Sequence, residues 1–156
     1  MKVSTKGRYA LRLMIDIAVH SEGGHIVPIA SIALRQSLSE KYLEQIIAAL
    51  AHAGFVKSVR GAQGGYHLTR TPQDYTVGEI LRVMEGSLSP VSCAHCTGDA
   101  VCPRADNCVT IEVWRKLDDA INGVVDHITL GDLVARYHAK HSDAFEPLDC
   151  PCDEGT

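Results

Sequence analysis

The sequence has no long hydrophobic run, and no apolar stretch approaches the roughly 20 residues that a membrane-spanning helix needs. Residues 1–10 are polar and basic, where a secretory signal would need an apolar core. The chain also lacks the glycine spacing of nucleotide-binding loops, paired carboxylates in an apolar setting, and a nucleophile beside an identifiable base. We therefore expect a cytoplasmic protein that has no membrane partner and is not an enzyme.

The composition sets the size of the fold. With 156 residues, 46% of them hydrophobic and 22% charged, the chain can form one core and a projecting helix but not two large domains. The formal net charge of −4 hides an asymmetry. Residues 1–70 hold nine Lys or Arg and four Asp or Glu, a net +5, whereas residues 71–156 hold six and fifteen, a net −9. The N-terminal half therefore has the basic character that phosphate binding requires.

Helical periodicity dominates the N-terminal part. Apolar residues recur at helical spacing over Thr5–His20, and a second apolar face on this helix needs a second neighbour, for which the long C-terminal helix is suited. A short helix over Pro28–Gln36 and a longer one over Glu40–His52 are joined by a serine turn. The longer helix has a compact polar face made of Lys41, Glu44, Gln45 and Ala48. This pattern predicts a helix-turn-helix whose second helix enters the major groove of DNA.

A β-hairpin is expected next. Phe55–Arg60 alternates apolar and polar side chains, residues 61–65 form a glycine-rich turn, and Tyr66–Thr69 returns as a second strand. In this position the hairpin is typical of the wing of a winged helix-turn-helix. Lys57 and Arg60 suit contact with phosphates or the minor groove.

The C-terminal half contains further helical patterns. One helix is expected to begin at Thr76, and an apolar stripe then runs from Val109 to Ile128 over about five turns. Such a stripe exceeds what one small domain can cover, which predicts a homodimer. A last short helix should end near Tyr137. The expected division is a winged helix-turn-helix DNA-binding domain (1–86), a cysteine segment (87–108), a dimerisation helix with a short final helix (109–137) and a flexible tail (138–156).

Four of the six cysteines lie within sixteen residues: Cys93, Cys96, Cys102 and Cys108. No periodicity spans residues 92–107, so we expect a loop that is ordered by something other than an apolar core. Without a secretory context, this clustering favours metal or redox chemistry over structural disulfides. Soft, anionic thiolates suit iron–sulfur clusters, and a zinc ion is the alternative because four thiolates also satisfy its tetrahedral preference. Cys150 and Cys152 lie in the tail and are expected to be incidental.

Several motifs occur in a fixed order along residues 1–137. They are Lys6-Gly7-Arg8-Tyr9-Ala10, Leu38-Ser39 with Tyr42-Leu43-Glu44-Gln45, Val59-Arg60-Gly61 with Gly64-Gly65-Tyr66, Val77-Gly78-Glu79-Ile80 and Ile128-Thr129-Leu130-Gly131-Asp132-Leu133. With these motifs the chain resembles the iron–sulfur cluster regulator family, the IscR, NsrR and CymR type. The resemblance implies a mainly α fold with a small β-hairpin wing and a long dimerisation helix. It also implies a homodimeric transcription factor, mainly a repressor, in which three loop cysteines hold an iron–sulfur cluster.

The resemblance assigns the ligands only in part. Cys102 and Cys108 match the last two cysteines of the cluster-binding members. For the first ligand, counting from Ser89-Pro90 favours Cys93, whereas an equal gap before Cys102 favours Cys96; we prefer Cys93. Ile111 replaces the histidine that is the fourth ligand in IscR-like members, and an apolar side chain cannot bind metal. The candidates for the fourth position are Cys96, Glu112, His95 and a residue of the partner subunit's first helix, and we prefer Cys96.

The cluster type and the signal depend on that fourth ligand. A [2Fe–2S] cluster is expected, with [4Fe–4S] as the alternative. A non-thiolate or easily exchanged fourth ligand would leave iron open to oxygen or nitric oxide, whereas four thiolates would make a more closed site. We expect redox sensing, with the signal decided by the ligand set. Two other functions remain alternatives: a cluster-free or zinc-containing regulator that acts through a protein partner, and an iron–sulfur electron carrier.

The resemblance also places residues on double-stranded operator DNA. Those at or near the major groove are Ser39, Lys41, Tyr42, Glu44 and Gln45, and Arg60 of the wing is expected in the minor groove. Gln45 suits paired hydrogen bonds to an adenine edge. Glu44 accepts from cytosine and repels other approaches, so we expect it to restrict the sites that are bound.

Overall fold

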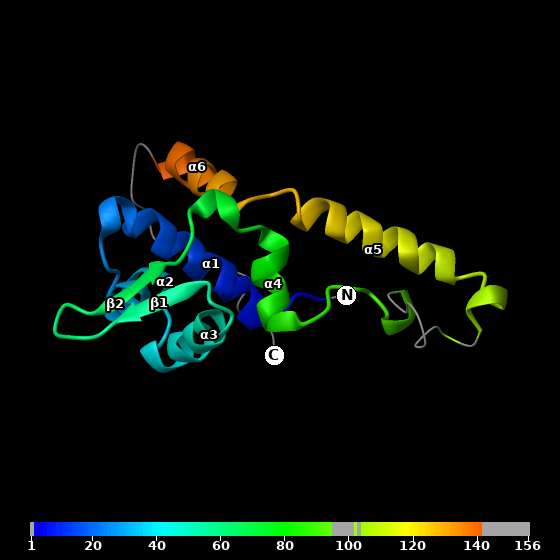
Figure 1. Cartoon of the computed structure of the whole chain (residues 1–156), viewed down its shortest axis with the longest axis horizontal. Helices are drawn as coiled ribbons and strands as arrows, with labels where there is room; N and C mark the ends of the chain where they lie inside the picture. The colour runs from blue at the N-terminus through cyan, green and yellow to red at the C-terminus, as the bar shows by residue number, and fades with distance from the viewer. Residues whose placement is uncertain (1, 95–101, 103, 142–156) are drawn as a thin grey trace.

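The fold is built around α1 (Thr5–His20), which runs through the middle of the N-terminal body (Figure 1). The computed structural model describes residues 2–94, 102 and 104–141. The side chain of Ser4 caps α1 by accepting a hydrogen bond from the backbone N–H of Gly7 at 3.1 Å. The fully buried side chains of α1 include Ala10, Leu13, Met14 and Ile17. None of the described helices is both long and apolar enough to cross a membrane.

The helix-turn-helix consists of α2 (Ile29–Gln36) and α3 (Glu40–His52). Ser37 ends α2 in the left-handed conformation, with φ 52°, which turns the chain sharply. The side chain of Ser39 then caps α3 by accepting a hydrogen bond from the N–H of Tyr42 at 3.2 Å. The buried side chains of α3 are Leu43, Ile46, Ile47 and Leu50. The predicted helix-turn-helix and its serine turn are confirmed.

The wing is an antiparallel hairpin of β1 (Val56–Val59) and β2 (Gly65–Leu68), in which Val56 pairs with Leu68. Gly64 lies so close to a backbone carbonyl oxygen of β1 that any Cβ at this position would collide with it. The glycine-rich turn therefore serves a close backbone approach within the hairpin. The hairpin lies beside α2 and α3, as a wing does (Figure 1).

A 3-10 turn, η2 (Pro72–Asp74), leads from the wing to α4 (Val77–Glu85). Thr76 and Glu79 begin α4 with a capping box, in which each side chain accepts a hydrogen bond from the other's backbone at 3.0 Å. Gly86 follows the last residue of α4 with φ 74°, a left-handed value that glycine accommodates without strain. The predicted helix in this region is confirmed.

The long helix, α5 (Ile111–Val125), projects away from the body formed by the other helices (Figure 1). It has 15 residues and is shorter than the apolar stripe from Val109 to Ile128. Val109 lies outside the helix and is 89% exposed. The described residues before α5 include two 3-10 turns, η3 (Ser92–Ala94) and η5 (Ala105–Asn107). The sequence therefore predicts this helix but not its ends.

The last helix, α6 (Leu130–His141), continues four residues beyond its expected end. Tyr137 stacks on His141 one turn later, with ring centroids 4.2 Å apart. Basic residues in the last turn also interact favourably with the helix dipole. Residues 138–141, expected in the tail, are therefore helical, whereas residues 142–156 lie outside the described part.

α1 packs mainly against α4 and α6 and also contacts α2, α3 and β2, so the main core surrounds it. A second, smaller cluster consists of the buried Val77, Leu81 and Leu88 with Leu11 of α1 and Ile121 of α5 packed against it. α5, expected as the second neighbour of α1, meets it through this cluster. α1 makes its most extensive contacts with α4 and α6, because α5 extends outward from the body.

Candidate nucleic-acid interface and cysteine segment

The exposed face of α3 carries most of the residues predicted to contact DNA. Lys41, Glu44 and Gln45 are exposed, and Tyr42 is half-buried. The core side chains of α3 point the other way, so helix geometry gathers these four on one face. Ser39 is exposed at the start of the same helix, where its hydroxyl is engaged as the cap.

The wing places Arg60 beside the first helix of the helix-turn-helix. Arg60 directly follows β1 and is exposed, as is Lys57 within β1. An open hollow of about 440 Å³ lies between the wing and the start of α2, and its lining includes Arg60, Ile29 and Ala30. A guanidinium beside the first backbone N–H groups of a helix suits contact with a phosphate.

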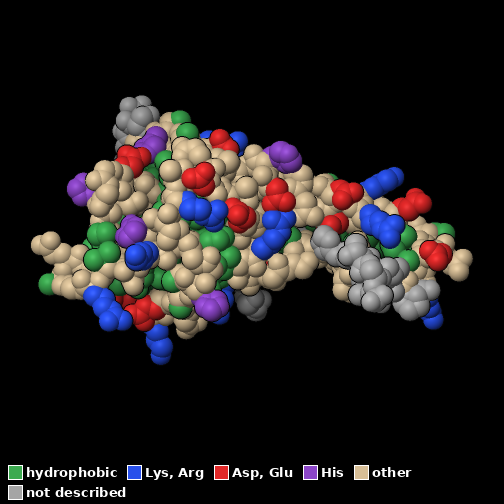
Figure 2. Space-filling model, in the orientation of Figure 1, with side chains coloured by type: hydrophobic (Ala, Val, Ile, Leu, Met, Phe, Trp, Pro, Cys, Tyr) green, Lys and Arg blue, Asp and Glu red, His purple; other side chains and the backbone are tan. Residues whose placement is uncertain are grey.

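Charge differs between the two ends of the molecule. Figure 2 shows Lys and Arg side chains projecting at the end where α3 and the wing lie, with acidic side chains beside them. Along α5, in the same view, several Asp and Glu side chains are interspersed with basic ones. The distribution agrees with the net +5 of residues 1–70, and it favours phosphate binding at the α3 end.

Tyr9 of α1 lies against the start of α3, and Arg12 of the same helix lies beside Tyr9. The ring of Tyr9 meets that of Tyr42 edge-on, with centroids 5.9 Å apart and an interplanar angle of 90°. The guanidinium carbon of Arg12 lies 5.3 Å from the Tyr9 ring centroid. The periodicity of apolar residues shows which faces of a helix are apolar, but not which side chains of other helices its polar residues contact. Only the motif that contains Tyr9 drew attention to this part of α1.

The structure describes three of the four predicted cysteine ligands, Cys93, Cys102 and Cys108. All three are free thiols and half-buried. Cys93 lies in η3, and Cys108 follows η5 shortly before α5. Cys96 and His95 lie outside the described residues, so the choice between Cys93 and Cys96 as first ligand stays a prediction.

Cys108 has an environment that favours its thiolate. Its Sγ lies 3.3 Å from Oγ1 of Thr110. Hydrogen bonds from the Thr110 side chain and backbone lower the pKa of this thiol, against a smaller opposing effect of desolvation. Because the thiolate is the form that binds metals, the position is suited to a ligand.

The donor chemistry of this segment fits a soft metal centre. Three free thiols are present, although within residues 2–94, 102 and 104–141 no three His, Cys, Asp or Glu side chains converge on one point. Ile111, which stands where IscR-like members have histidine, is only 6% exposed and packs inward. Glu112, another candidate, is exposed in the first turn of α5.

An ion pair joins α5 to the body. Arg82 of α4 donates to the two carboxylate oxygens of Asp126 at 2.6 and 2.9 Å, and to Oδ1 of Asn122 at 2.6 Å. The hydrogen bond from Arg82 lowers the pKa of Asp126, and the same contact raises the pKa of Arg82. The C-terminal end of α5 is thus held on α4, while the N-terminal end adjoins the cysteine segment.

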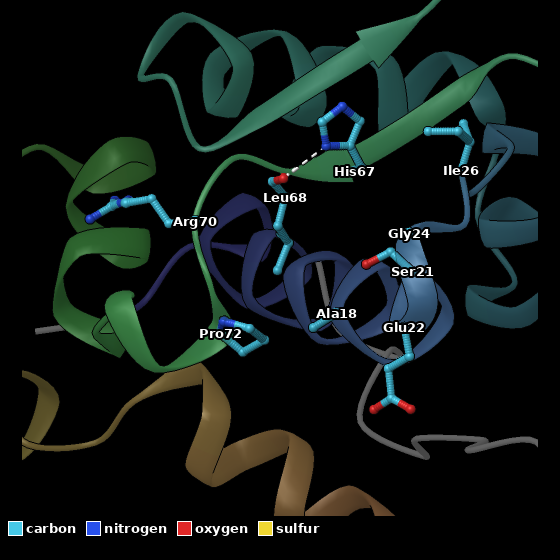
Figure 3. A pocket seen from close by; sticks show the side chains of 9 residues that line it. All are labelled: Ala18, Ser21, Glu22, Gly24, Ile26, His67, Leu68, Arg70 and Pro72. Carbon is cyan, nitrogen blue, oxygen red and sulfur yellow. Dashed lines mark hydrogen bonds between the residues drawn. The ribbon is translucent and has the colours of Figure 1, made fainter.

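An open hollow of about 450 Å³ lies between the end of α1, β2 and η2 (Figure 3). Its titratable lining groups are engaged in other contacts. Glu22 pairs with His138, the His67 ring is hydrogen-bonded to the Leu68 carbonyl, and Arg70 extends away to Glu79. The residues that line the hollow therefore form no acid–base pair with one another.

Comparison with known proteins identifies the class of regulator. The model of the Rrf2 family, described as an iron-dependent transcriptional regulator, matches residues 3–136. The HTH-type transcriptional regulator IscR of Cronobacter sakazakii is 39% identical over 153 residues, which cover 94% of this chain and 92% of that protein.

Two solved structures share the fold. IscR of T. potens is 45% identical with a TM-score of 0.71, covering 90% of this chain and 91% of that one. CymR (YrzC), the global cysteine regulator of B. subtilis, is 43% identical with a TM-score of 0.71, covering 87% of this chain and 98% of that one. The predicted winged helix-turn-helix fold is confirmed, and the chain is a DNA-binding transcriptional regulator and not an enzyme. It belongs to the Rrf2 family.

Proposed function

We propose that the chain is a homodimeric regulator, mainly a repressor, that binds operator DNA in the cytoplasm under the control of an iron–sulfur cluster. One observation carries the proposal. The free thiols of Cys93, Cys102 and Cys108 lie between a winged helix-turn-helix and a projecting helix with an exposed apolar face. In this order along the chain, the segment proposed to bind metal adjoins both the domain proposed to bind DNA and the helix proposed to pair the subunits.

The DNA contact is proposed for the face of α3 and the wing. In the major groove, Gln45 forms paired hydrogen bonds with an adenine edge, and Glu44 accepts from cytosine while repelling phosphates and other acceptors. Arg60 enters the minor groove or binds its phosphates. The exposure of all three side chains at the basic end of the molecule supports this assignment.

The dimer contact is proposed for α5. Val113, Leu117 and Val124 are 51%, 44% and 59% exposed, and their spacing places them on one stripe of the helix. The opposite side of α5 already faces the protein through the buried Ile111 and Asp118. A second copy of α5 across a two-fold axis covers this stripe with an identical apolar surface.

The cluster is proposed to bind Cys93, Cys102 and Cys108, with Cys96 as the fourth ligand and [2Fe–2S] as the type. When bound, the cluster supplies iron–thiolate bonds that order the segment and a centre that responds to redox conditions. The protein contributes the free thiols and the lowered pKa of Cys108. Ile111 cannot bind metal at the place of the family histidine, so the fourth ligand must come from another residue, and Cys96 is proposed in preference to Glu112, His95 and a residue of the partner subunit's first helix.

The control of DNA binding is proposed to pass through α5. The cysteine segment directly precedes this helix, and Arg82 and Asp126 join the helix to α4, which packs on α1. Ordering of the segment therefore biases how α5 meets its partner and how the two recognition helices are spaced.

Operator binding with and without the cluster tests the proposal. Duplexes selected by the wild-type protein from a random-sequence pool are titrated with anaerobically loaded protein and with protein stripped of iron. We expect at least one class of duplex to change affinity by about 5-fold to 150-fold. A Cys150→Ser variant, altered in the tail, should behave as wild type. Equal affinities on every duplex contradict cluster control while leaving DNA binding intact.

A further inference from the structure

A buried carboxylate ties α1 to the helix-turn-helix. Asp16 of α1 is 5% exposed. Arg35 of α2 donates to it in a fork, from Nη2 to Oδ1 at 2.6 Å and from Nε to both oxygens at 3.1 and 3.2 Å. Gln36 adds a hydrogen bond from Nε2 to Oδ2 at 2.9 Å. A two-pronged guanidinium–carboxylate contact fixes the relative rotation of its partners as well as their distance, so α2 is locked to α1 at this point.

Gln36 extends the contact toward α3. Its Oε1 accepts a hydrogen bond from Nε of Arg12 at 2.9 Å, while its Nε2 donates to Asp16. The amide is therefore oriented from both ends. The guanidinium of Arg12 then lies 5.3 Å from the ring centroid of Tyr9. Hydrogen bonding through Nε sets the plane of that guanidinium, which a lysine ammonium does not reproduce.

The chain of contacts ends on the recognition helix. Tyr9 is 7% exposed and meets the Tyr42 ring edge-on. Tyr42 belongs to the first turn of α3 and precedes the buried residues of that helix. The Ser39 cap fixes its backbone by accepting a hydrogen bond from its N–H. The cap does not fix the side-chain rotamer of Tyr42, whereas contact with the Tyr9 ring restricts the rotamers that Tyr42 can adopt.

We propose that Tyr9, Arg12 and Gln36 are positioning residues for sequence-specific DNA binding. They act on DNA through Tyr42 and are anchored on the Asp16–Arg35 pair. The inference rests on the proposed contact of the α3 face with DNA. An ordered side chain at a binding surface loses less conformational entropy on association, so this set raises affinity for the operator more than for unrelated DNA.

Substitutions that keep the charge or the ring shape distinguish a positioning role in DNA binding from a general electrostatic attraction to DNA. Arg12→Lys keeps the positive charge but loses the Nε hydrogen bond and the planar contact. We expect it to weaken binding to the selected operator duplex about twofold to tenfold, with affinity for an unrelated duplex and the salt slope unchanged. Tyr9→Leu should act in the same way, and Tyr9→Phe, which keeps the ring, should retain more operator affinity than Tyr9→Leu. Arg136→Lys, at an exposed position of α6, is the matched control for replacing an arginine by lysine.

A double-mutant cycle gives the decisive result. Tyr9→Leu should weaken operator binding when Tyr42 is present and have little further effect in a Tyr42→Ala background. Unfolding temperatures of all variants are measured in parallel, and binding is compared well below them. Additive effects, or equal losses on operator and unrelated duplexes, overturn the inference. The proposed function fails separately if the wild-type protein selects no duplex from the pool.

Discussion

At the scale of single residues, the outer face of α3 combines a group that attracts one base with a group that rejects others. Glu44 and Gln45 are adjacent and exposed. A carboxylate close to the groove is unfavourable unless a cytosine amino group meets it, because it repels phosphates and base acceptors alike. Selectivity at this surface therefore depends on a side chain that lowers affinity for most sequences.

Glu44→Ala should relax sequence choice at one base pair by roughly 1 to 3 kcal/mol, because the alanine neither accepts from cytosine nor repels other bases. The measurement is affinity for a panel of operator duplexes that differ at single positions. A variant with the same base preferences as wild type, or with losses spread over all positions, contradicts the assignment.

Arg60→Ala should weaken binding to every duplex and reduce the slope of log affinity against log salt by about 1, because one phosphate-neutralising charge is lost. Titrations at several salt concentrations, on operator and unrelated duplexes, measure both effects. Arg136→Ala removes an exposed charge from α6 and should leave the slope unchanged. Loss of affinity for a single sequence only would show that Arg60 contacts a base and not the backbone.

Residue patterns foretold some of these roles and not others. Lys41, Glu44 and Gln45 were found because polar residues opposite an apolar stripe are exposed on any helix. The contacts among Asp16, Arg35 and Gln36 join groups 19 and 20 residues apart. The spacing of apolar residues along one helix gives no information about contacts between polar residues so far apart in the sequence. The sequence therefore predicted that these residues are helical but not that they contact one another.

At the scale of elements, the helix starts that are marked by a capping side chain agree with prediction. α1 and α3 have the predicted bounds, and Ser4 and Ser39 cap them. α5 has no side-chain cap at Thr110, and its apolar pattern begins before the helix does. Apolar spacing continues through Val109 although that residue is exposed, so periodicity alone overestimates the length.

Asp126→Asn should flatten the acid side of the stability profile. The contact with Arg82 lowers the pKa of Asp126 below its ordinary 3.8. A carboxyl group with a lower pKa in the folded state than in the unfolded state stabilises the fold at pH values above its unfolded-state pKa. This stabilisation is lost as the pH falls through its folded-state pKa. The wild-type cluster-free protein should therefore lose more stability than the variant as pH falls from about 5 through 3.8 and below.

Thermal unfolding of the cluster-free protein over this pH range measures the effect of Asp126. Asp119→Asn, which alters an exposed carboxylate of the same helix, is the control and should follow the wild-type profile. Parallel profiles for wild type and Asp126→Asn would show that the ion pair to Arg82 adds nothing to stability.

At the scale of the whole molecule, the residues proposed to contact DNA lie far from the cysteines proposed to bind the cluster. The wing and α3 lie at one end of the body, η5 lies at the far end of the projecting helix, and η3 lies beside that helix (Figure 1). The order of these parts was predictable from the sequence because each has its own pattern. The direction in which α5 extends depends on packing with α4, which no single pattern records.

Leu117→Glu should convert the protein to monomers, because an ionised side chain in the apolar stripe of α5 cannot be buried against its copy without a partner. Sedimentation velocity measures the change. Arg115→Glu, on the opposite side of the same helix, places a glutamate at an exposed site and should leave the dimer intact. A monomeric wild-type protein, or a dimeric Leu117→Glu variant, contradicts the proposed interface.

The iron and acid-labile sulfide content of the full chain, purified without oxygen, tests the central claim most directly. We predict a coloured protein with iron and sulfide in near-equal amounts, and the colour should be lost in Cys102→Ser and retained in Cys150→Ser. A colourless wild-type protein that contains neither iron nor sulfide, or that contains zinc in their place, would contradict it.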